Sequence, residues 1–450
     1  MDKTELFEKA PVHKAVINMA VPTILSMIVT IFYNMADTFF VGQTGNSLYI
    51  SAVSLASPVF LIFTAFSSMF GAGGSSVISR ALGMGEPEKA KKTSAFVCYA
   101  SLIFGVLMTV GVLVSMEPLL TLIGTDAQTH DFVKEYLTWI GLGATFSVFG
   151  GTFSNVIRSE GASSDAMTGH IVGSIINIIL DPIMILWLGM GVQGAAVATV
   201  IGNMAACIIY ASYFFRKPSQ LSIHPRDFNP TGRLVWEVIS IGLPSAATSL
   251  LSTVANVLMN RTLVAYSNNA VAGMGVAMKI NTVAVYVLLG LGTGIQPLIG
   301  YNYGSGNKKR LMDIFKFSSI ASVVVGAVLT AIMVVLRTPI IHAFINDQEV
   351  IDYGTHMLVA LQMAGPILGL VFIGANTIQA MGKALAAFIL NLLRQGIFLI
   401  PLIFILDHFF GLSGVVFSNP VADYLAVVVS YIVCIRYMKQ MEKPSTDPEF

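Results

Sequence analysis

The chain alternates between long runs of apolar residues and short polar connections. A helix needs about 20 mostly apolar residues to cross a bilayer. A backbone in lipid must also satisfy its own N–H and C=O groups, and the two-residue alternation of barrel strands is absent, so we predict helices. Twelve spans are expected, at 15–42, 52–79, 94–115, 136–158, 165–187, 192–215, 238–266, 270–300, 317–336, 356–380, 385–407 and 412–437.

The composition supports a membrane protein. The 450 residues are 55% hydrophobic and 11% charged, whereas soluble domains are roughly 25% charged. The net charge of +1 creates no global field that would attract nucleic acid, so no nucleic-acid partner is expected. The predicted fold class is an all-α polytopic membrane protein that acts in the lipid bilayer as a monomer.

Basic and acidic residues occupy alternate connections between the spans. The basic connections contain Arg80, Lys89, Lys91, Lys92, Arg158, Arg216, Lys217, Arg226, Arg233, Lys308, Lys309, Arg310, Lys316 and Lys383. The acidic connections contain Glu117, Asp126, Asp131, Glu135, Asp347, Glu349 and Asp352. The positive-inside rule then places the basic connections and both termini in the cytoplasm, with the chain in the cell (cytoplasmic or inner) membrane. This orientation requires an even number of spans, and twelve satisfies it.

The two halves of the chain carry similar motifs in the same order and at a nearly constant offset. Pro22 corresponds to Pro244, and NVIRSEG (155–161) corresponds to NTIQAMG (376–382). Six spans in each half give both halves the same orientation, which predicts a parallel repeat. We therefore expect an N-lobe at 1–225 with spans one to six and a C-lobe at 226–450 with spans seven to twelve. A cavity between two such lobes can open to either side when they rock.

Polar residues inside the spans are the candidates for chemistry, because a charge at mid-span costs about 2.5–3.5 kcal/mol. Asn177 and Asp181 are four residues apart and share one helix face. The next turn is centred on Met190, and Thr199 follows it by as many residues as Asp181 precedes it, so both are expected about 13 Å from that turn. Asp37 lies six residues before the exit of span one at Gln43, at similar depth.

This cluster has a functional and a structural interpretation. Hard oxygen ligands suit Na⁺, and paired buried carboxylates can instead carry a proton. A purely structural cluster would hydrogen-bond to its neighbours and hold helices together. The repeat favours the functional interpretation of the cluster, because a structural cluster is expected in both halves. The second half instead has Met259, Ile397 and Pro401 at the positions of Asp37, Asn177 and Asp181.

Other charged residues are expected inside the spans of the second half of the chain. Arg394 and Asp423 are expected mid-span on neighbouring helices, where we predict a structural ion pair. Arg261 and Lys279 have no assigned role: Lys279 suits either a polar cavity or the neutralisation of a carboxylate.

Motifs for catalysis and cofactors are absent or out of context. GMGVQG (189–194) fits a dinucleotide-binding pattern but lacks a βαβ unit, and GKA at 382–384 fails the phosphate-loop pattern. No nucleophile–base pair, structural metal site or cofactor motif is found. We therefore expect a protein that is not an enzyme and uses no cofactor beyond a coupling ion.

Three segments resemble the multidrug and toxic compound extrusion (MATE) family, and within it the MepA-like exporters. They are ADTFFVGQ after a proline-bearing span, NIILDPIMI followed by GVQGAAVAT, and QPLIGYNYGSGNKKR. The resemblance covers the whole chain and implies twelve helices in two lobes, with a cation site at Asp37, Asn177, Asp181 and Thr199. It also implies a bend in the first helix at Pro22.

The resemblance implies a function as well. It indicates a secondary active antiporter that exports cationic, often aromatic, drugs in exchange for inward Na⁺ or H⁺, a type of transport that confers antibiotic resistance. Candidate residues of the substrate cavity are Tyr136, Asn155, Asn34 and Asn203. The NorM-like branch carries a Glu in span seven, which this chain lacks, and that difference favours the N-lobe site. The alternative is a lipid-linked oligosaccharide flippase of the related superfamily, which would need a strongly basic central cavity.

Overall fold

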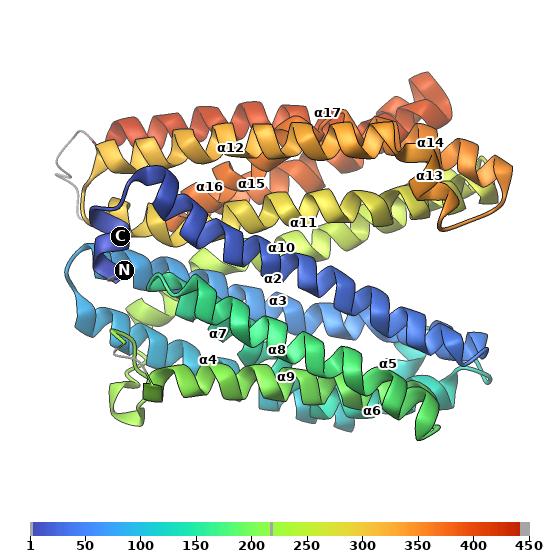
Figure 1. The fold of residues 1–450 in the computed structure, drawn as a ribbon, viewed down its shortest axis with the longest axis horizontal. Coiled ribbons are helices and arrows are strands. Elements are labelled where there is room, and N and C mark those ends of the chain that lie inside the picture. The colour runs from blue at the N-terminus through green and yellow to red at the C-terminus, as the bar shows by residue number, and fades with distance from the viewer. Residues whose placement is uncertain (1–2, 217–218, 442–450) are drawn as a thin grey trace. The chain divides into compact units, whose positions relative to one another are not determined.

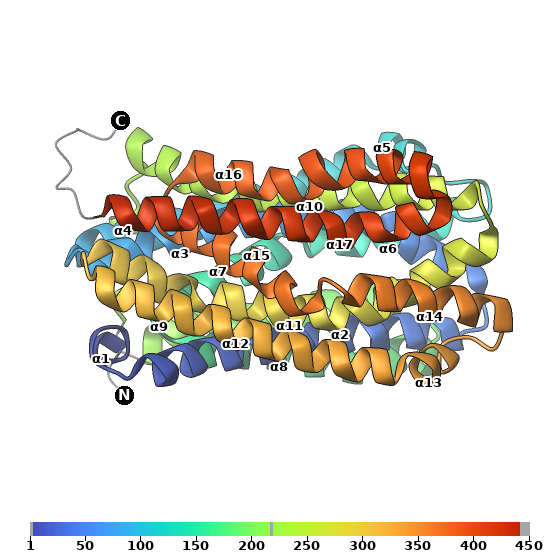
Figure 2. The same cartoon turned by 90° about the horizontal axis from the view of Figure 1, so that it is seen from above.

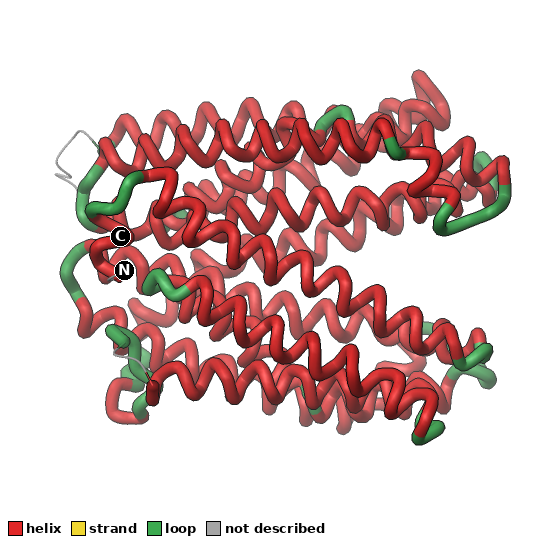
Figure 3. Tube along the Cα trace, in the orientation of Figure 1, coloured by secondary structure: helices red, strands yellow, loops and turns green. Residues whose placement is uncertain are grey.

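The computed structural model describes residues 3–216 and 219–441, and helices make up nearly all of this part of the chain (Figure 3). No strand occurs within the described ranges. The longer helices are α2 (Val12–Gln43), α3 (Ser47–Gly83), α4 (Pro87–Val114), α6 (His130–Leu142), α7 (Ala144–Ser159), α8 (Ser163–Asp181), α9 (Gly191–Arg216), α10 (Gly232–Val264), α11 (Asn268–Gly304), α12 (Lys308–Val335), α14 (Gln348–Gln362), α15 (Gly365–Ala380), α16 (Ala384–Leu392) and α17 (Ile400–Gln440). The short elements are α1 (Lys3–Glu8), α5 (Met116–Leu122), α13 (Arg337–His342), the 3₁₀ turn η2 (Pro225–Asp227) and two π-helical segments, η1 (Pro182–Trp187) and η3 (Leu393–Leu399).

The spans agree with the all-α membrane fold expected from the hydropathy. Among the described residues, nine helical stretches are long and apolar enough to cross a membrane, and two bent helix pairs raise the number to 11. The last stretch, Ala384–Gln440, has 57 residues, which is about 85 Å of straight helix and far too long for one bilayer. Gly411 breaks it with φ 57° and ψ −140°, a conformation open essentially to glycine alone. Division at Gly411 yields the predicted spans eleven and twelve.

Two spans are bent, which the hydropathy pattern does not reveal. The helices α6 and α7 meet at an angle of 50°, and α14 and α15 do the same. These pairs correspond to the predicted spans 136–158 and 356–380. Apolar character continues through both bends, so only the interrupted backbone hydrogen bonding distinguishes them from straight spans.

Contacts among Cα atoms divide the chain into two units. One consists of Leu25–Ala246, which we call the Asp37 unit, and the other of Met1–Ile24 with Ala247–Phe450, which we call the Arg394 unit. Two helices therefore change unit part-way: α2 after Ile24 and α10 after Ala246. In each, a proline, Pro22 or Pro244, precedes the change by two residues. These units assign 1–24 and 226–246 differently from the lobes inferred from the repeat, whose boundaries stay a prediction.

Within the Asp37 unit, α8 and α9 pack along each other as an antiparallel pair, and α3 packs on α4 and α7 (Figure 1). A cluster of buried apolar side chains that includes Phe63, Leu137 and Val148 joins α3, α6 and α7. Within the Arg394 unit, α11 contacts α12, α14 and α15, while α16 lies beside α17 (Figure 2). Each unit thus has its own packed interior.

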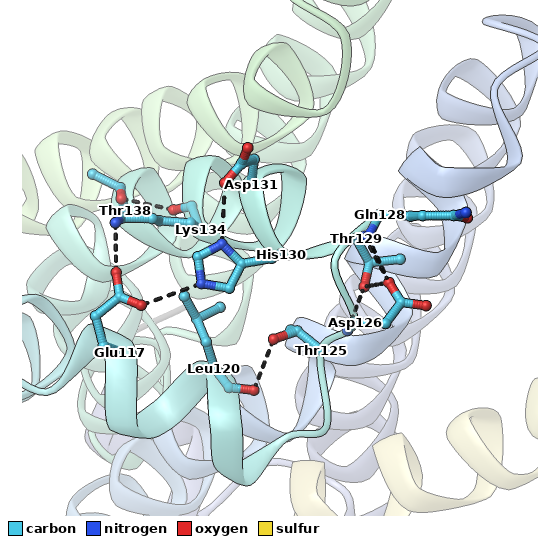
Figure 4. Close-up of polar contacts among 10 residues, drawn as sticks. All are labelled: Glu117, Leu120, Thr125, Asp126, Gln128, Thr129, His130, Asp131, Lys134 and Thr138. Carbon is cyan, nitrogen blue, oxygen red and sulfur yellow. Dashed lines mark hydrogen bonds and ion pairs between the residues drawn. The ribbon is translucent and has the colours of Figure 1, made fainter.

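The acidic connection between α5 and α6 is held by a polar network (Figure 4). Lys134 Nζ donates to Glu117 Oε1 at 2.5 Å, and the ring nitrogens of His130 lie 3.2 Å from Glu117 and 3.0 Å from Asp131. The hydrogen bonds from Lys134 and His130 lower the pKa of the Glu117 carboxyl. In the same loop, hydrogen bonds from Thr129 lower the pKa of Asp126.

Candidate cation site

Asn177 lies at the centre of a polar cluster inside the Asp37 unit. Its Nδ2 is 3.4 Å from Asp181 Oδ1, on the same face of α8, and 3.4 Å from Thr199 Oγ1 on α9. Asp181 is 0% exposed, Asn177 1% and Thr199 5%. The structure therefore brings together three of the four residues that the sequence placed at one depth.

The detailed alignment differs from the predicted one by one helical turn. We expected Thr199 opposite Asp181, whereas Thr199 faces Asn177, four residues earlier. One contribution lies between Asp181 and the turn, where η1 is π-helical. A π turn takes more residues than an α turn, so Asp181 is closer to the turn than α geometry predicts. Pro182 favours this irregularity because it has no backbone N–H to donate.

Asp37 completes the group from α2. It is 9% exposed and close enough to Asp181 for their charges to interact. Tyr33, one helical turn before Asp37, reaches the side chain of Thr199, and Tyr136 of α6 lies near both carboxylates. Sequence reasoning identified Tyr136 but missed Tyr33. The four-residue spacing from Asp37 was the signal that could have identified Tyr33.

Several oxygens of the cluster accept no hydrogen bond. Within the described ranges, Asp37 Oδ1, Asn177 Oδ1 and Asp181 Oδ2 are buried without a partner. Buried polar atoms are nearly always bonded, and an unpaired one is costly. No Lys or Arg in the described part of the chain pairs with either carboxylate. Three unbonded oxygens and two uncompensated acids form a set of donors that fits a small hard cation or a proton.

The cluster is not a transition-metal centre by composition. Among the described residues, no group of three or more His, Cys, Asp or Glu side chains is arranged to hold a metal ion. The cluster instead combines two carboxylates with an amide and hydroxyls, and the three cysteines lie buried and unpaired. Such oxygen ligands select cations such as Na⁺ over soft metals.

Among the described residues, no hydrogen bond joins the other candidate cavity residues to this cluster. Asn203 Nδ2 donates to Ser147 Oγ at 3.0 Å and so joins α9 to α7. Asn155 donates to the Gly151 carbonyl at 3.0 Å and accepts from Arg158 at 3.1 Å, while Asn34 is exposed on α2. Their assignment to a substrate cavity stays a prediction.

The charged residues of the Arg394 unit have different environments. Arg394 Nε donates to Asp423 Oδ1 at 2.6 Å, and its guanidinium carbon lies 5.5 Å from the centre of the Phe372 ring. The predicted ion pair is therefore present, and its structural role stays a prediction. Arg261 and Lys279 are exposed. Pro22 lies inside α2, which continues as a helix on both sides of it.

The long apolar helices and the buried polar cluster between them define a multi-pass α-helical membrane protein. Comparison with known families identifies the class of membrane protein. The MatE family model matches residues 22–183 and again residues 244–405. This chain belongs to the MatE family. The two matches begin at Pro22 and Pro244, the two prolines that the internal repeat pairs.

Individual relatives and structures agree with this membership. The chain is 31% identical to the Multidrug export protein MepA of Staphylococcus saprophyticus subsp. saprophyticus, over 95% of this chain and 94% of the relative. It is 30% identical to the Multidrug export protein MepA of Staphylococcus haemolyticus, over 94% of each chain. A solved structure described as the outward-facing conformation of a multidrug resistance MATE family transporter of the MOP superfamily is 25% identical. It superposes with a TM-score of 0.93 over 99% of both chains.

Proposed function

We propose that this chain is a secondary active multidrug efflux antiporter. It exports cationic and aromatic compounds from the cytoplasm in exchange for inward Na⁺ or H⁺, and it acts as a monomer in the cell membrane with both termini in the cytoplasm. The relatives named as multidrug export proteins support the substrate class. The observation that carries the coupling is the set of unbonded buried oxygens on Asp37, Asn177 and Asp181.

The charges of the cluster explain how cation binding changes the protein. Asp37 on α2 and Asp181 at the end of α8 repel each other when both are ionised, and low local dielectric strengthens that repulsion. A bound Na⁺ or proton removes this repulsion and draws the two helices together. The outer part of α2 then moves relative to the part before Pro22, where a backbone hydrogen bond is missing and bending costs least.

This movement couples the cation to the drug. The cluster lies toward the acidic connections, which are outside the cell in the proposed orientation. The cation therefore enters from outside and moves α2, which belongs to both units. Cation binding releases a bound drug outward. The cation-loaded transporter then opens inward, where the cation leaves and the next drug binds, and the drug-loaded transporter returns. A ligand shifts such an equilibrium only by its differential affinity for the two states, so drug and cation must favour different states.

Transport by purified protein in liposomes tests the proposal. Efflux of a fluorescent aromatic cation, ethidium, is measured with a Na⁺ gradient and a pH gradient imposed separately. We expect Asp37→Asn and Asp181→Asn each to reduce gradient-driven efflux at least about tenfold, because each removes a charge that binds the cation. Asp131→Asn is the matched control, since that side chain is 87% exposed in the acidic connection. Undiminished cation-driven efflux in either cluster variant would show the mechanism to be wrong.

A further inference from the structure

The interface between α8 and α9 closes tightly on the side of the cluster that faces the basic connections. Gly173 lies one helical turn from Asn177 and opposite Gly202. A Cβ atom added to Gly173 would come within 2.7 Å of the Gly202 carbonyl oxygen, and one added to Gly202 would come within 2.7 Å of the Gly173 carbonyl oxygen. The two backbones therefore touch, and neither a side chain nor water fits between them at this level.

A buried positive charge follows beyond this contact. Arg158, in the last turn of α7, is 3% exposed. It donates to Asn155 Oδ1 at 3.1 Å and to Ser154 Oγ at 3.3 Å, and its Nε has no partner among the described residues. Both acceptors are neutral, and buried charges are normally paired with an opposite charge.

The groups around Arg158 do not cancel its charge. Tyr210 of α9 and His170 of α8 lie close to it, and the Tyr210 hydroxyl donates to the Ala166 carbonyl at 3.1 Å. The nearest acid along the chain, Glu160, binds Tyr213, Ser219 at 2.7 Å and the Gln220 backbone N–H at 3.1 Å. No carboxylate in the described part of the chain accepts a hydrogen bond from Arg158.

The distance from the cluster follows from helix geometry. Tyr210 is eleven residues beyond Thr199 on the same helix, which is about 16 Å along the axis. The order from the cluster toward the basic connections is therefore carboxylates, glycine contact and guanidinium. An arginine at a constriction excludes cations from membrane pores in the same way.

The repeat offers an internal comparison. Gln379 occupies the position of Arg158 in the second half, where NTIQAMG aligns with NVIRSEG. That half also lacks the carboxylates, which Met259 and Pro401 replace. The buried arginine thus occurs in the half that carries the cation cluster.

We infer that Arg158 and the Gly173–Gly202 contact form a seal that prevents a cation at Asp37 and Asp181 from crossing the interior of the unit toward the basic connections. The inference rests on the proposed binding of a cation at the cluster. The seal prevents the cation from leaking through the unit. The cation reaches the cytoplasm only when the transporter changes conformation, so the cation gradient is not lost without drug export.

Cation leak in the absence of drug tests the seal. Protein in liposomes is given a Na⁺ gradient or a pH gradient, and uptake of ²²Na⁺ or acidification of the lumen is recorded with no drug present. Arg158→Gln copies the residue of the second half and removes the charge. Ser154→Asp instead leaves the arginine in place and supplies a carboxylate to pair with it. We expect either variant to raise the leak at least roughly fivefold, from the Coulomb energy of one charge about 16 Å away. We expect Arg158→Lys to stay as tight as the wild type.

Two further measurements make the outcome decisive. The double variant Arg158→Gln/Asp181→Asn should not leak, because the path of the cation passes through the cluster. A leak that persists in the double variant would overturn the inference. Arg158→Gln and Ser154→Asp proteins that are folded and leak no more cation than the wild type would also overturn it. Folding is checked by monodispersity and thermal unfolding in detergent. Wild-type cation-driven ethidium efflux is recorded in the same liposomes. Its absence would refute the proposed antiport, whereas intact antiport with tight variants would refute the seal alone.

Discussion

Asp37 and Asp423 are both buried acids, and the protein satisfies them in different ways. Asp423 is bonded to Arg394 at 2.6 Å, with the side chains 9% and 18% exposed. Asp37 shares its surroundings with a second carboxylate and retains an unbonded oxygen. Removing the base from a buried ion pair is costly, and a buried acid without a base needs a proton or a cation to compensate its charge.

The pairing of Asp423 predicts a large effect of a single substitution. Asp423→Asn leaves the partly buried Arg394 without a counter-charge and should lower the free energy of unfolding by about 3–5 kcal/mol. The double variant Asp423→Leu/Arg394→Met removes both charges and should recover most of that loss. Chemical denaturation in mixed micelles measures both. A single variant as stable as the wild type would show that the pair contributes nothing to stability.

Irregular backbone segments within the helices determine where the spans end and where their side chains lie. The π segment η1 moves Asp181 toward the turn after α8, and Gly411 divides a 57-residue stretch that would otherwise be far longer than the membrane is thick. Both breaks occur where the backbone lacks a regular hydrogen-bond pattern. Helix geometry alone therefore does not place the side chains of these spans.

Gly411 provides a direct test of this dependence. Gly411→Ala forces a side chain into positive φ and should destabilise the protein by about 1–3 kcal/mol. Gly275→Ala is the matched control, because Gly275 is helical and a Cβ there meets nothing within 4 Å. That control should be neutral or stabilising by up to about 1 kcal/mol. Thermal unfolding of the two variants in detergent compares them; equal behaviour would show that the turn does not require glycine.

The fold and much of the cluster were predictable from the sequence. Apolar runs identify spans because lipid demands them, and the turn at Met190 identified Asn177, Asp181 and Thr199 as neighbours. The one-turn shift at Thr199 was not predictable, since it depends on the geometry of the turn after α8 and in part on the π-helical η1. The proximity of Tyr33 and the isolation of Arg158 depend on packing between helices, which hydropathy and periodicity do not encode.

In the whole chain, each of the two units contains the first part of a helix whose second part belongs to the other unit. The unit with most of the C-terminal half also includes Met1–Ile24, and the unit with most of the N-terminal half also includes residues 226–246. The two transitions, after Ile24 and after Ala246, each follow a proline by two residues, and the repeat pairs these prolines, Pro22 and Pro244. The two helices that change unit, α2 and α10, therefore do so at positions that correspond in the internal repeat.

Separate expression of the halves tests this organisation. Fragments 1–225 and 226–450 each lack a segment that packs in their own unit, so each alone should aggregate or be degraded. Produced together, they should copurify as one complex with ethidium efflux restored. Full-length protein cleaved at an engineered protease site in the linker 216–233 is the control for the broken connection. A stable, monodisperse 1–225 fragment on its own would contradict the expected dependence.

The exchanged helix halves also bear on the ancestry of the chain. A single six-helix ancestor, before duplication, would have had no partner within its own chain for the first part of its first helix. Two copies could have supplied that partner reciprocally, as a domain-swapped dimer. Fusion of the genes would then have fixed the dimer in one polypeptide and freed each half to diverge. Only one half now carries the carboxylates, which a symmetric dimer could not have confined to one side.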